Sequence, residues 1–418
     1  MTVEQHLAHA MQAQRQGRGD DVRREIEAAL KLKPNHPVAL NLLGMESLDR
    51  DDPVEAAVHF AAAANADPKA VALWLNLAKA HRLKGDDAAE RAALDSALAT
   101  DQRNLNAHIR LAQLHERRGE MGDATMRWSG VAQMASEHLA PPQDLQAIFD
   151  HAREFIADRR RLLDVAMTTG LSSDLASATE RDRRRVTAAM DVMMGRRSVY
   201  YNQCFGMHYP FLPADEFFDR DHFPWLAGLE AETPRIRAEV QMLLASEDAG
   251  LSPYVTMPPG TPTNIWSELN NNNAWSALHL WKEGERIDGA CARAPITAGI
   301  VEKLPLAGVP GRAPTVFFSI LEAGKHIPPH TGVTNTRTII HLPLIVPDGC
   351  KFRCGGETRD WREGEAFAFD DTIEHEAWNP SDQDRAVLIL DCWNPHLSQH
   401  EREMICRLYD VADDQKNA

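Results

Sequence analysis

The chain has 418 residues, more than one compact domain usually holds, so we expect two or three domains. Hydrophobic residues make up 44% of the chain and charged residues 25%, which excludes a mostly disordered protein. Against 61 Asp and Glu stand 45 Lys and Arg, and the formal net charge of −16 argues against nonspecific binding of nucleic acid or of an anionic membrane.

The sequence contains no stretch that is typical of a membrane span. The longest apolar run, near residues 339–346, is interrupted by His341 and Pro343, whereas a span needs about 20 apolar residues. The first residues lack the basic start and apolar core of a signal peptide. Six cysteines in a chain of this length do not make a disulfide scaffold, so we expect a cytoplasmic protein.

A repeat of 34 residues occupies the first third of the chain. Two rows of residues recur in step: small residues at Ala10, Gly44, Ala78 and Ala112, and turn residues at Gly17, Asp51, Gly85 and Gly119. Small residues let paired helices approach closely, and Gly or Asp favours a chain reversal. The pattern resembles the tetratricopeptide repeat, with three well-formed units over about Pro34–Ala135 and a looser one from near Val3.

We therefore expect an N-terminal α-solenoid over residues 1–135. Such a solenoid offers a surface for a protein or peptide substrate or partner, and a purely structural N-terminal cap is the alternative. Residues 136–196 keep the helical spacing of apolar residues and are expected to form a helical connector. The Pro-, Gly-, Thr- and Asn-rich residues 252–273 predict a long loop, and long loops often line sites.

The last part of the chain, residues 197–418, is expected to be a β-domain with a C-terminal helix. Short runs with alternating apolar residues, separated by turn signals, predict strands over residues 277–281, 315–321, 337–346, 351–354, 365–369, 374–378 and 385–391. Many short strands at this spacing predict a sandwich or jelly roll. Ser398 and Glu401 have the spacing of a capping box, which opens the terminal helix.

Several polar residues fall where this domain should bury apolar ones. Strand alternation places Arg337, Ile339 and His341 on one face, and it places Arg385 on a face with Val387 and Ile389. A buried arginine needs an anionic partner. The β-domain is therefore expected to hold a small acidic ligand, and its histidines could also hold a metal.

Iron is the first metal to consider. Non-haem Fe(II) oxygenases bind iron through two histidines and one carboxylate, commonly spelled His-x-Asp or His-x-Glu with a second histidine some tens of residues later. His330 and His375 have the required spacing, but Gly332 stands at the carboxylate position. From these residues alone, either water takes the third position or the site is not an iron site.

Four motifs in combination resemble the aspartyl/asparaginyl β-hydroxylase family, over roughly Arg197 to Pro395. The motifs are His-Thr-Gly-Val-Thr-Asn-Thr-Arg at 330–337, His-Leu-Pro-Leu at 341–344, Cys-Lys-Phe-Arg-Cys at 350–354 and Phe-Asp-Asp-Thr-Ile-Glu-His-Glu-Ala-Trp at 369–378. The resemblance implies a double-stranded β-helix (jelly-roll) domain that uses Fe(II) and 2-oxoglutarate. It also implies iron held by two histidines without a carboxylate, so Gly332 matches the family. Members with helical repeats ahead of the oxygenase domain are known.

The resemblance carries over residue by residue. His330 and His375 match the iron ligands, and Arg385 matches the arginine that binds the distal carboxylate of 2-oxoglutarate. Further positions match the cosubstrate pocket or its surroundings: Ser319, His341, Trp275, Arg337 and the second acid Asp371. A planar guanidinium suits a carboxylate because it can donate two parallel hydrogen bonds.

One position departs from the family. Members often carry a second arginine two residues after Arg337, and Ile339 stands there instead. The site therefore has one cation fewer for a substrate carboxylate. An aspartyl or asparaginyl residue, another peptide side chain, a free amino acid and a fatty-acyl chain all stay open as substrates.

These residues together predict an Fe(II)/2-oxoglutarate-dependent dioxygenase that hydroxylates a C–H bond of a peptide or protein side chain, with the repeats docking the substrate or partner. One alternative is a hydroxylase of a small-molecule or acyl substrate. Another is a repeat-based adaptor whose β-domain binds a ligand without catalysis. A zinc or other-metal hydrolase is disfavoured because no general base is placed beside the histidines.

Overall fold

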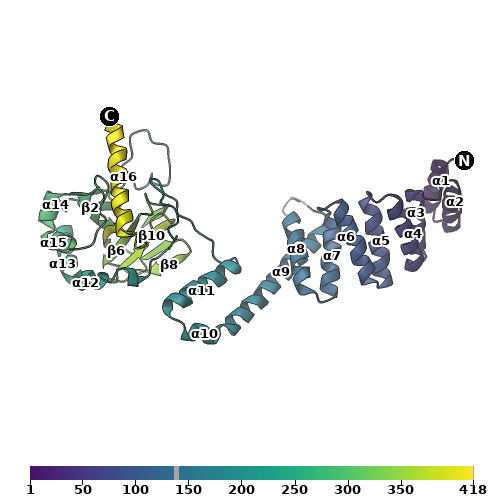
Figure 1. Ribbon diagram of the computed structural model, residues 1–418, viewed down its shortest axis with the longest axis horizontal. Helices are drawn as coiled ribbons and strands as arrows, with labels where there is room; N and C mark the ends of the chain where they lie inside the picture. The colour runs from purple at the N-terminus through teal and green to yellow at the C-terminus, as the bar shows by residue number, and fades with distance from the viewer. Residues whose placement is uncertain (136–140, 418) are drawn as a thin grey trace. The chain divides into compact units, whose positions relative to one another are not determined.

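A computed structural model describes residues 1–135 and 141–417 and divides the chain into two compact units, Met1–Ala176 and Ser177–Ala418. In Figure 1 the chain runs from purple helices through teal to the green and yellow β-domain. The division falls inside the connector predicted over residues 136–196, whose first positions, 136–140, lie outside the described residues. In the described part of the chain, no helix is both long enough and apolar enough to cross a bilayer.

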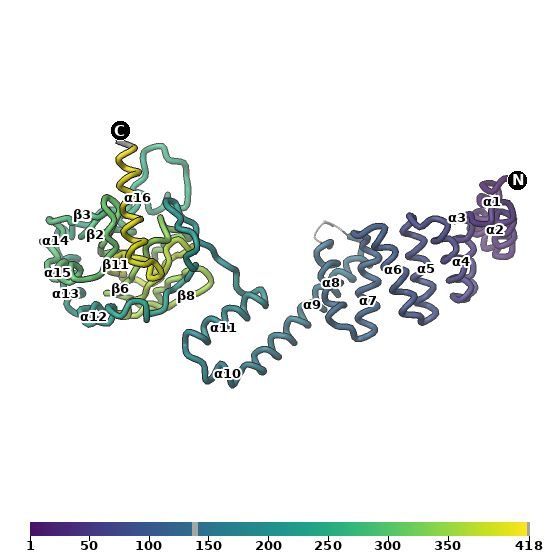
Figure 2. The backbone as a smooth tube through the Cα atoms, viewed as in Figure 1, coloured from purple at the N-terminus to yellow at the C-terminus, as the bar shows by residue number. Residues whose placement is uncertain are grey.

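Within residues 1–135 the first unit forms four consecutive helix pairs (Figure 2). The first helices are α1 (Val3–Arg15), α3 (Pro37–Asp49), α5 (Val71–Lys84) and α7 (Leu105–Arg117); the second helices are α2 (Gly19–Leu32), α4 (Pro53–Ala66), α6 (Asp87–Thr100) and α8 (Met121–Ala135). Each first helix begins 34 residues after the one before it, and each second helix does the same. The predicted repeat is confirmed, and its first unit is as regular as the others.

The recurring residues of the repeat have the structural roles that the pattern predicts. Gly17, Asp51, Gly85 and Gly119 all have positive φ, from 59° to 75°, and each lies between the two helices of a pair. Gly44 permits a close helix contact, because a Cβ there would lie 2.7 Å from the ring of Phe60. Short-range chain reversal and close packing therefore fix the spacing of the repeat.

Three helices follow the pairs: α9 (Gln143–Gly170), α10 (Ser172–Ser177) and α11 (Glu180–Met193). Phe149 and Ala152 of α9 share a buried cluster with Trp128 of α8, so α9 extends the packing of the repeat region. In the second unit, Arg184 of α11 donates to Glu357 at 2.7 Å and to the carbonyl of Phe217 at 3.0 Å. The last helix of the predicted connector is thus attached to the β-domain.

The second unit contains two antiparallel sheets, as the alternation predicts. The large sheet has the order β1 (Ser252–Pro253), β2 (Trp275–Lys282), β4 (Val316–Leu321), β11 (Arg385–Trp393), β6 (Arg337–Ile345) and β9 (Phe367–Phe369), with β3 (Glu285–Arg286) paired to β2. The small sheet has the order β5 (Lys325–His330), β10 (His375–Asn379), β7 (Lys351–Cys354) and β8 (Glu357–Asp360). The pattern did not predict β5 or β8. β5 contains Pro328 and Pro329, which an edge strand tolerates because it needs fewer backbone donors.

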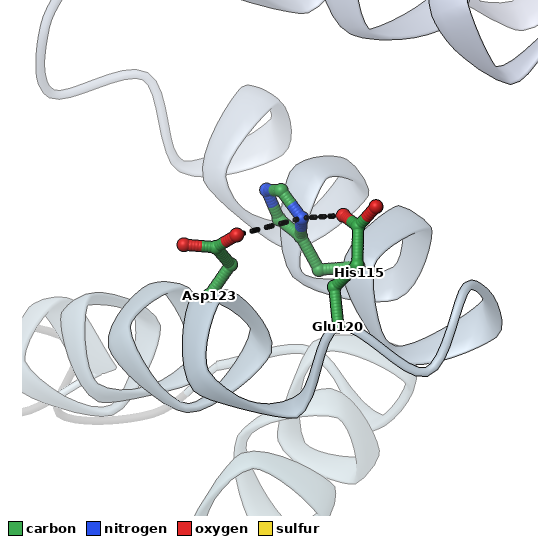
Figure 3. Close-up of side chains that lie close together, drawn as sticks. All are labelled: His115, Glu120 and Asp123. Carbon is green, nitrogen blue, oxygen red and sulfur yellow. Dashed lines mark hydrogen bonds and ion pairs between the residues drawn. The ribbon is translucent and has the colours of Figure 1, made fainter.

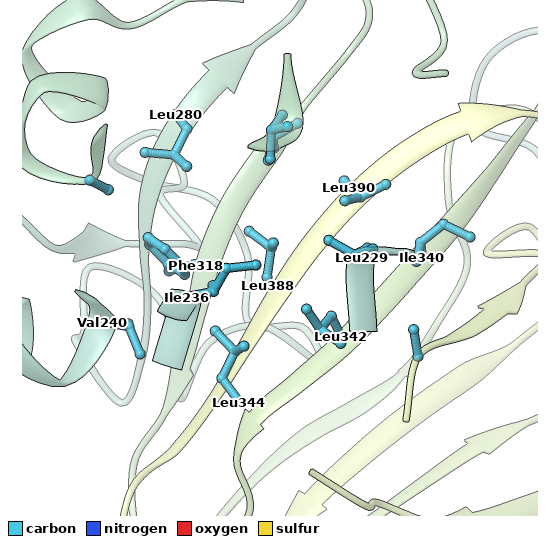
Figure 4. Packing of buried hydrophobic residues seen from close by; sticks show 14 of the residues in the cluster. Leu229, Ile236, Val240, Leu280, Phe318, Ile340, Leu342, Leu344, Leu388 and Leu390 are labelled. Atoms are coloured by element: carbon cyan, nitrogen blue, oxygen red, sulfur yellow. The ribbon is translucent and has the colours of Figure 1, made fainter. Parts of the chain in front are cut away.

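A helical layer covers one face of the large sheet. It consists of η1 (Arg220–His222), α12 (Leu226–Ala231), α13 (Thr233–Leu244), α14 (Asp288–Arg293) and α15 (Pro295–Val301). Figure 4 shows Ile340, Leu342 and Leu344 of β6 in one cluster with Leu229 and Ile236 of the helices. Since successive side chains on a strand point to opposite faces, Ile339 and His341 point away from the helices.

The opposite face of the large sheet packs against the small sheet. A second cluster joins Leu321 and Val387 of the large sheet to Ile327, Phe352 and Ala377 of the small one. The polar residues of β4, β6 and β11 point into the space between the sheets.

The C-terminal helix α16 (Gln399–Asn417) begins with the predicted capping box: Glu401 N donates to Ser398 Oγ at 3.3 Å, and Ser398 N donates to Glu401 Oε2 at 2.8 Å.

Candidate functional site

Two histidines lie side by side at one end of the small sheet. His330 ends β5 and His375 begins β10, and the antiparallel register makes them direct cross-strand partners. Their ring centroids lie 4.1 Å apart. His330 Nδ1 donates to the carbonyl of Pro328 at 2.7 Å, and His375 Nδ1 donates to the carbonyl of Ile373 at 3.0 Å. Both imidazoles therefore keep the Nε2 lone pair for a ligand.

Burial favours the neutral form of both rings. It lowers the pKa of His330 below its ordinary value and lowers that of His375 well below it. For His375 the charge of the neighbouring His330 lowers the pKa further. A neutral imidazole is the form that binds a transition metal, so this pair has the chemistry of two metal ligands on one side of a cavity.

Asp371 occupies the space beside Gly332. Gly332 N donates to the carbonyl of Asp371 at 2.6 Å, and a Cβ built on Gly332 would overlap the Asp371 carboxylate. Within residues 1–135 and 141–417, the buried Asp371 Oδ1 has no hydrogen-bond partner, and burial raises the pKa of this carboxyl to about 7. A carboxyl group thus lies next to the glycine that interrupts the His-x-Asp pattern, although it comes from another part of the chain.

Arg385 is buried, and no described residue pairs a carboxylate with it. It is 2% exposed, and its Nε and Nη1 have no hydrogen-bond partner among the residues that the structure describes. The guanidinium lies over the ring of Trp361, 4.8 Å from the centroid, and burial lowers the pKa of Arg385 to about 10. An unpaired cation in a protein interior is unfavourable. Its environment therefore suits an anionic ligand that enters the cavity.

Three further predicted residues lie around this cation. Trp275 Nε1 donates to Ser319 Oγ at 3.0 Å, and Val387, two residues from Arg385, is the strand partner of Ser319. His341 stacks on Trp361 with centroids 5.4 Å apart, and in the described part of the chain its Nδ1 has no hydrogen-bond partner. Burial lowers the pKa of His341 well below its ordinary value, and the charge of Arg385 lowers it further. The structure brings these groups together with Arg385.

Arg337 lies in the same cavity but is already paired. Its Nη1 donates to Asp391 Oδ2 at 2.5 Å and to the carbonyl of Arg312 at 3.2 Å. Burial raises the pKa of Asp391, and Arg337 partly offsets this by lowering it. The sequence did not predict this ion pair. With Ile339 as an apolar neighbour on the same strand face, this part of the cavity offers little net positive charge to a substrate.

The predicted site residues line one cavity of about 940 Å³: Trp275, Ser319, His330, Gly332, Arg337, Ile339, His341, Asp371, His375 and Arg385. The predicted loop 252–273 also lines it, through Tyr254, Val255 and Trp266, as expected of a long loop near a site. The ring of Trp266 meets that of His330 edge-on, with centroids 4.9 Å apart. Composition predicted the loop, but no sequence signal distinguished Trp266 from the other aromatic residues.

A different cluster lies in the repeat region, where α7 meets α8 (Figure 3). His115 Nδ1 is 2.7 Å from Glu120 Oε2 and 3.9 Å from Asp123 Oδ2. Arg118 also binds Glu120, at 2.7 Å, and this hydrogen bond is the main cause that lowers the pKa of Glu120. Since an arginine already neutralises one carboxylate, we interpret the cluster as ion pairing across the turn.

The fold and cavity define an antiparallel β-domain with a histidine pair and a buried arginine in one site. A family model described as "Aspartyl/Asparaginyl beta-hydroxylase" matches residues 230–395. The chain is 32% identical over 200 residues to the ornithine lipid ester-linked acyl 2-hydroxylase of Rhizobium tropici, covering 47% of this chain and 67% of that protein. The chain therefore belongs to the aspartyl/asparaginyl β-hydroxylase family.

The human aspartyl/asparaginyl beta-hydroxylase is 40% identical over 139 residues, which cover 33% of this chain and 18% of the human protein. Among solved structures, a thermophilic TPR protein of Thermus thermophilus, TTC0263, is 17% identical with a TM-score of 0.30, covering 46% of this chain and 100% of that one. A score of this size supports no conclusion. The repeat assignment rests on the helix spacing within this chain.

Proposed function

We propose that this chain is an Fe(II)- and 2-oxoglutarate-dependent hydroxylase of a peptide or protein side chain. The observation that carries the proposal is the convergence of His330, His375 and the unpaired Arg385 on one cavity. Two neutral imidazoles suit a ferrous ion, and a buried guanidinium suits the far carboxylate of a dicarboxylate cosubstrate. Family membership supports the same reaction class.

We also infer that the two sheets form a double-stranded β-helix. The eight consecutive strands β4 to β11 form two four-stranded layers, β4-β11-β6-β9 and β5-β10-β7-β8, and the chain changes layer at every connection except that of the β7–β8 pair. Such a jelly-roll arrangement leaves an interior between the layers. The side chains proposed as ligands point into it.

The side chains that line the cavity suit Fe(II) and 2-oxoglutarate. His330 and His375 would hold Fe(II) through Nε2, because each Nδ1 is engaged by a carbonyl. The unpartnered nitrogens of Arg385 and the hydroxyl of Ser319 would hold the distal carboxylate of 2-oxoglutarate. When bound, Fe(II) and 2-oxoglutarate would supply the oxidation. One atom of O2 enters a substrate C–H bond, and the other enters succinate, which forms with CO2 from 2-oxoglutarate.

The protein residues then have three tasks in the reaction. Arg385 and the Trp275–Ser319 pair orient the cosubstrate along the cavity. His341, Trp361 and Phe352 pack around it and exclude water. Asp371 places a carboxyl group beside Gly332, which stands at the carboxylate position of the His-x-Asp pattern. This carboxyl group can accept a hydrogen bond.

A second substrate class is favoured by one observation. Ile339 is apolar and Arg337 is already paired with Asp391, so the cavity-facing side of β6 presents no unpaired cation among the described residues. The Rhizobium relative is named for an acyl substrate. A fatty-acyl chain is therefore the alternative to a peptide side chain.

The proposal is tested by succinate release from 2-oxoglutarate with added Fe(II) under air. We expect turnover by the wild-type protein and loss of about 100-fold or more in His375→Ala, because one of two metal ligands is gone. His400→Ala is the control: His400 lies on α16, has a 78% exposed side chain and does not line the cavity.

An anaerobic, iron-loaded sample would then be used to capture substrates, and products would be read by mass spectrometry after oxygen is admitted. A peptide gaining one oxygen atom supports the main proposal, and an acyl lipid gaining one supports the alternative. No succinate from any preparation, with intact iron binding, would favour a non-catalytic ligand-binding adaptor.

A further inference from the structure

Polar side chains form a continuous surface across the first helices of three consecutive repeats. We call the following set the polar strip: Asn41 on α3; Asn76, Lys79 and Arg82 on α5; Arg110 and Gln113 on α7. Asn76, Lys79 and Arg82 are three residues apart, so they share one face of α5, and Arg110 and Gln113 share one face of α7. Lys79 and Arg82 are exposed, and the other four are half-buried.

Hydrogen bonds between neighbouring repeats join the polar strip. Asn76 Nδ2 donates to Asn41 Oδ1 at 2.8 Å, which links α5 to α3. Arg82 Nη1 donates to Gln113 Oε1 at 3.0 Å, and Arg110 Nη1 donates to the carbonyl of Leu75 at 2.7 Å. The last two contacts link α5 to α7. The strip is therefore one surface held in register by the repeat.

The polar strip carries three positive charges without matching acids. Among the described residues no ion pair joins Lys79, Arg82 or Arg110 to a carboxylate. Glu90 interacts electrostatically with Arg82 and Arg110, but it accepts its hydrogen bond from Arg117, at 2.6 Å.

Glu116, the next residue along the α7 face, accepts hydrogen bonds from Trp128 and His151 instead. The polar strip is thus positively charged in a chain whose formal net charge is −16.

Arg110 adds to the argument because of its environment. Burial lowers its pKa, and the positive charge of Arg82 lowers it further. Among the residues described, its side chain makes one hydrogen bond, to a neutral carbonyl. Two neighbouring guanidinium groups, one of them partly desolvated, are an unfavourable arrangement that an anionic ligand would relieve.

We propose that the polar strip binds an extended acidic segment of a partner protein. The cations pair with Asp and Glu side chains of the segment, and the amides of Asn41, Asn76 and Gln113 pair with its backbone. An amide side chain offers both donors and acceptors, as an extended peptide backbone requires. This binding is independent of the proposed hydroxylation and is measured without it.

The test uses the full chain and fluorescence anisotropy with labelled twelve-residue peptides. One peptide alternates Asp and Glu with Gly and Ser, and a second replaces each acid by its amide. We expect the acidic peptide to bind about tenfold or more tightly than its amide counterpart, with affinity falling as salt is added. The double variant Lys79→Ala/Arg82→Ala should lose about tenfold in affinity, since two charge pairs are removed.

The matched control removes two exposed lysines of the same unit outside the polar strip, Lys31→Ala/Lys69→Ala. Unchanged affinity in this control is expected. Equal losses in both double variants would show a general charge effect and overturn the proposal. Equal binding of the amide peptide, no binding of the acidic one, or tighter binding of a single-stranded oligonucleotide of equal charge would also overturn it.

Discussion

The carboxylate of Asp371 fills the space that a side chain at Gly332 would need. The two residues also share a backbone hydrogen bond, from Gly332 N to the carbonyl of Asp371, at 2.6 Å. A glycine at this position is therefore required by packing, in addition to its place in the family motif. The same contact holds Asp371, in the segment between β9 and β10, close to His330, which ends β5.

Gly332→Ala is expected to displace Asp371 and to destabilise the protein by about 1–3 kcal/mol, the usual cost of overpacking a buried site. Succinate formation should fall at the same time, because the added methyl group disturbs the residues beside His330. Chemical denaturation and the succinate assay measure the two effects. The control is Gly289→Ala, where a Cβ meets no atom within 4 Å. Wild-type stability of Gly332→Ala would contradict the contact.

Arg385→Met should stabilise the protein in the absence of cosubstrate while it abolishes 2-oxoglutarate binding. The wild-type guanidinium is buried with two unsatisfied nitrogens, and leaving such groups unpaired costs about 1–3 kcal/mol. Thermal unfolding with and without 2-oxoglutarate gives both quantities. Arg362→Met, at a 72% exposed side chain, is the control. Strong destabilisation by Arg385→Met would contradict the prediction and indicate a structural role for the guanidinium.

The sequence predicted the parts of this protein that depend on local pattern. Helix spacing and turn positions follow from residues close together in the chain, whereas His330, His375 and Arg385 became candidates through the family resemblance of the motifs around them. The Arg337–Asp391 pair joins residues 54 positions apart and depends on strand register. β5 was missed because Pro328 and Pro329 disfavour a strand except at an edge, and edge position is a property of the assembled sheet.

His279 is expected to make stability depend on pH between about 4 and 6.5. Burial lowers its pKa to about 4 in the folded protein, where it stacks with Phe317 and Tyr254. Below the unfolded value of about 6.5 the unfolded chain binds a proton that the folded protein does not. Stability is therefore complete above pH 6.5 and falls as the pH is lowered toward 4.

His279→Phe keeps an aromatic ring in the stack and removes this proton. Urea unfolding at pH 5 and pH 7 should show a smaller loss of stability at pH 5 than in the wild type, by on the order of 1 kcal/mol after allowance for solvent screening. The control is His400→Gln, at a 78% exposed side chain. An unchanged difference between the two pH values would contradict the prediction.

Gly44→Ala is expected to destabilise the repeat unit. The new methyl group would lie 2.7 Å from the ring of Phe60, which is 1% exposed and has little room to move. A loss of about 1–3 kcal/mol is expected, and circular dichroism during thermal unfolding measures it. Gly130→Ala on α8 is the control: its Cβ meets nothing within 4 Å, so better helix propensity should leave it neutral or stabilised by up to about 1 kcal/mol.

Anaerobic calorimetry of 2-oxoglutarate binding, with and without Fe(II), tests most directly whether the histidine pair and Arg385 form the two ends of one cosubstrate site. We expect tight binding only with iron, and losses of about 100-fold or more in both His375→Ala and Arg385→Met, since each removes one end of the chelated diacid. Equal affinity with and without iron, or wild-type affinity in either variant, would contradict the proposed site.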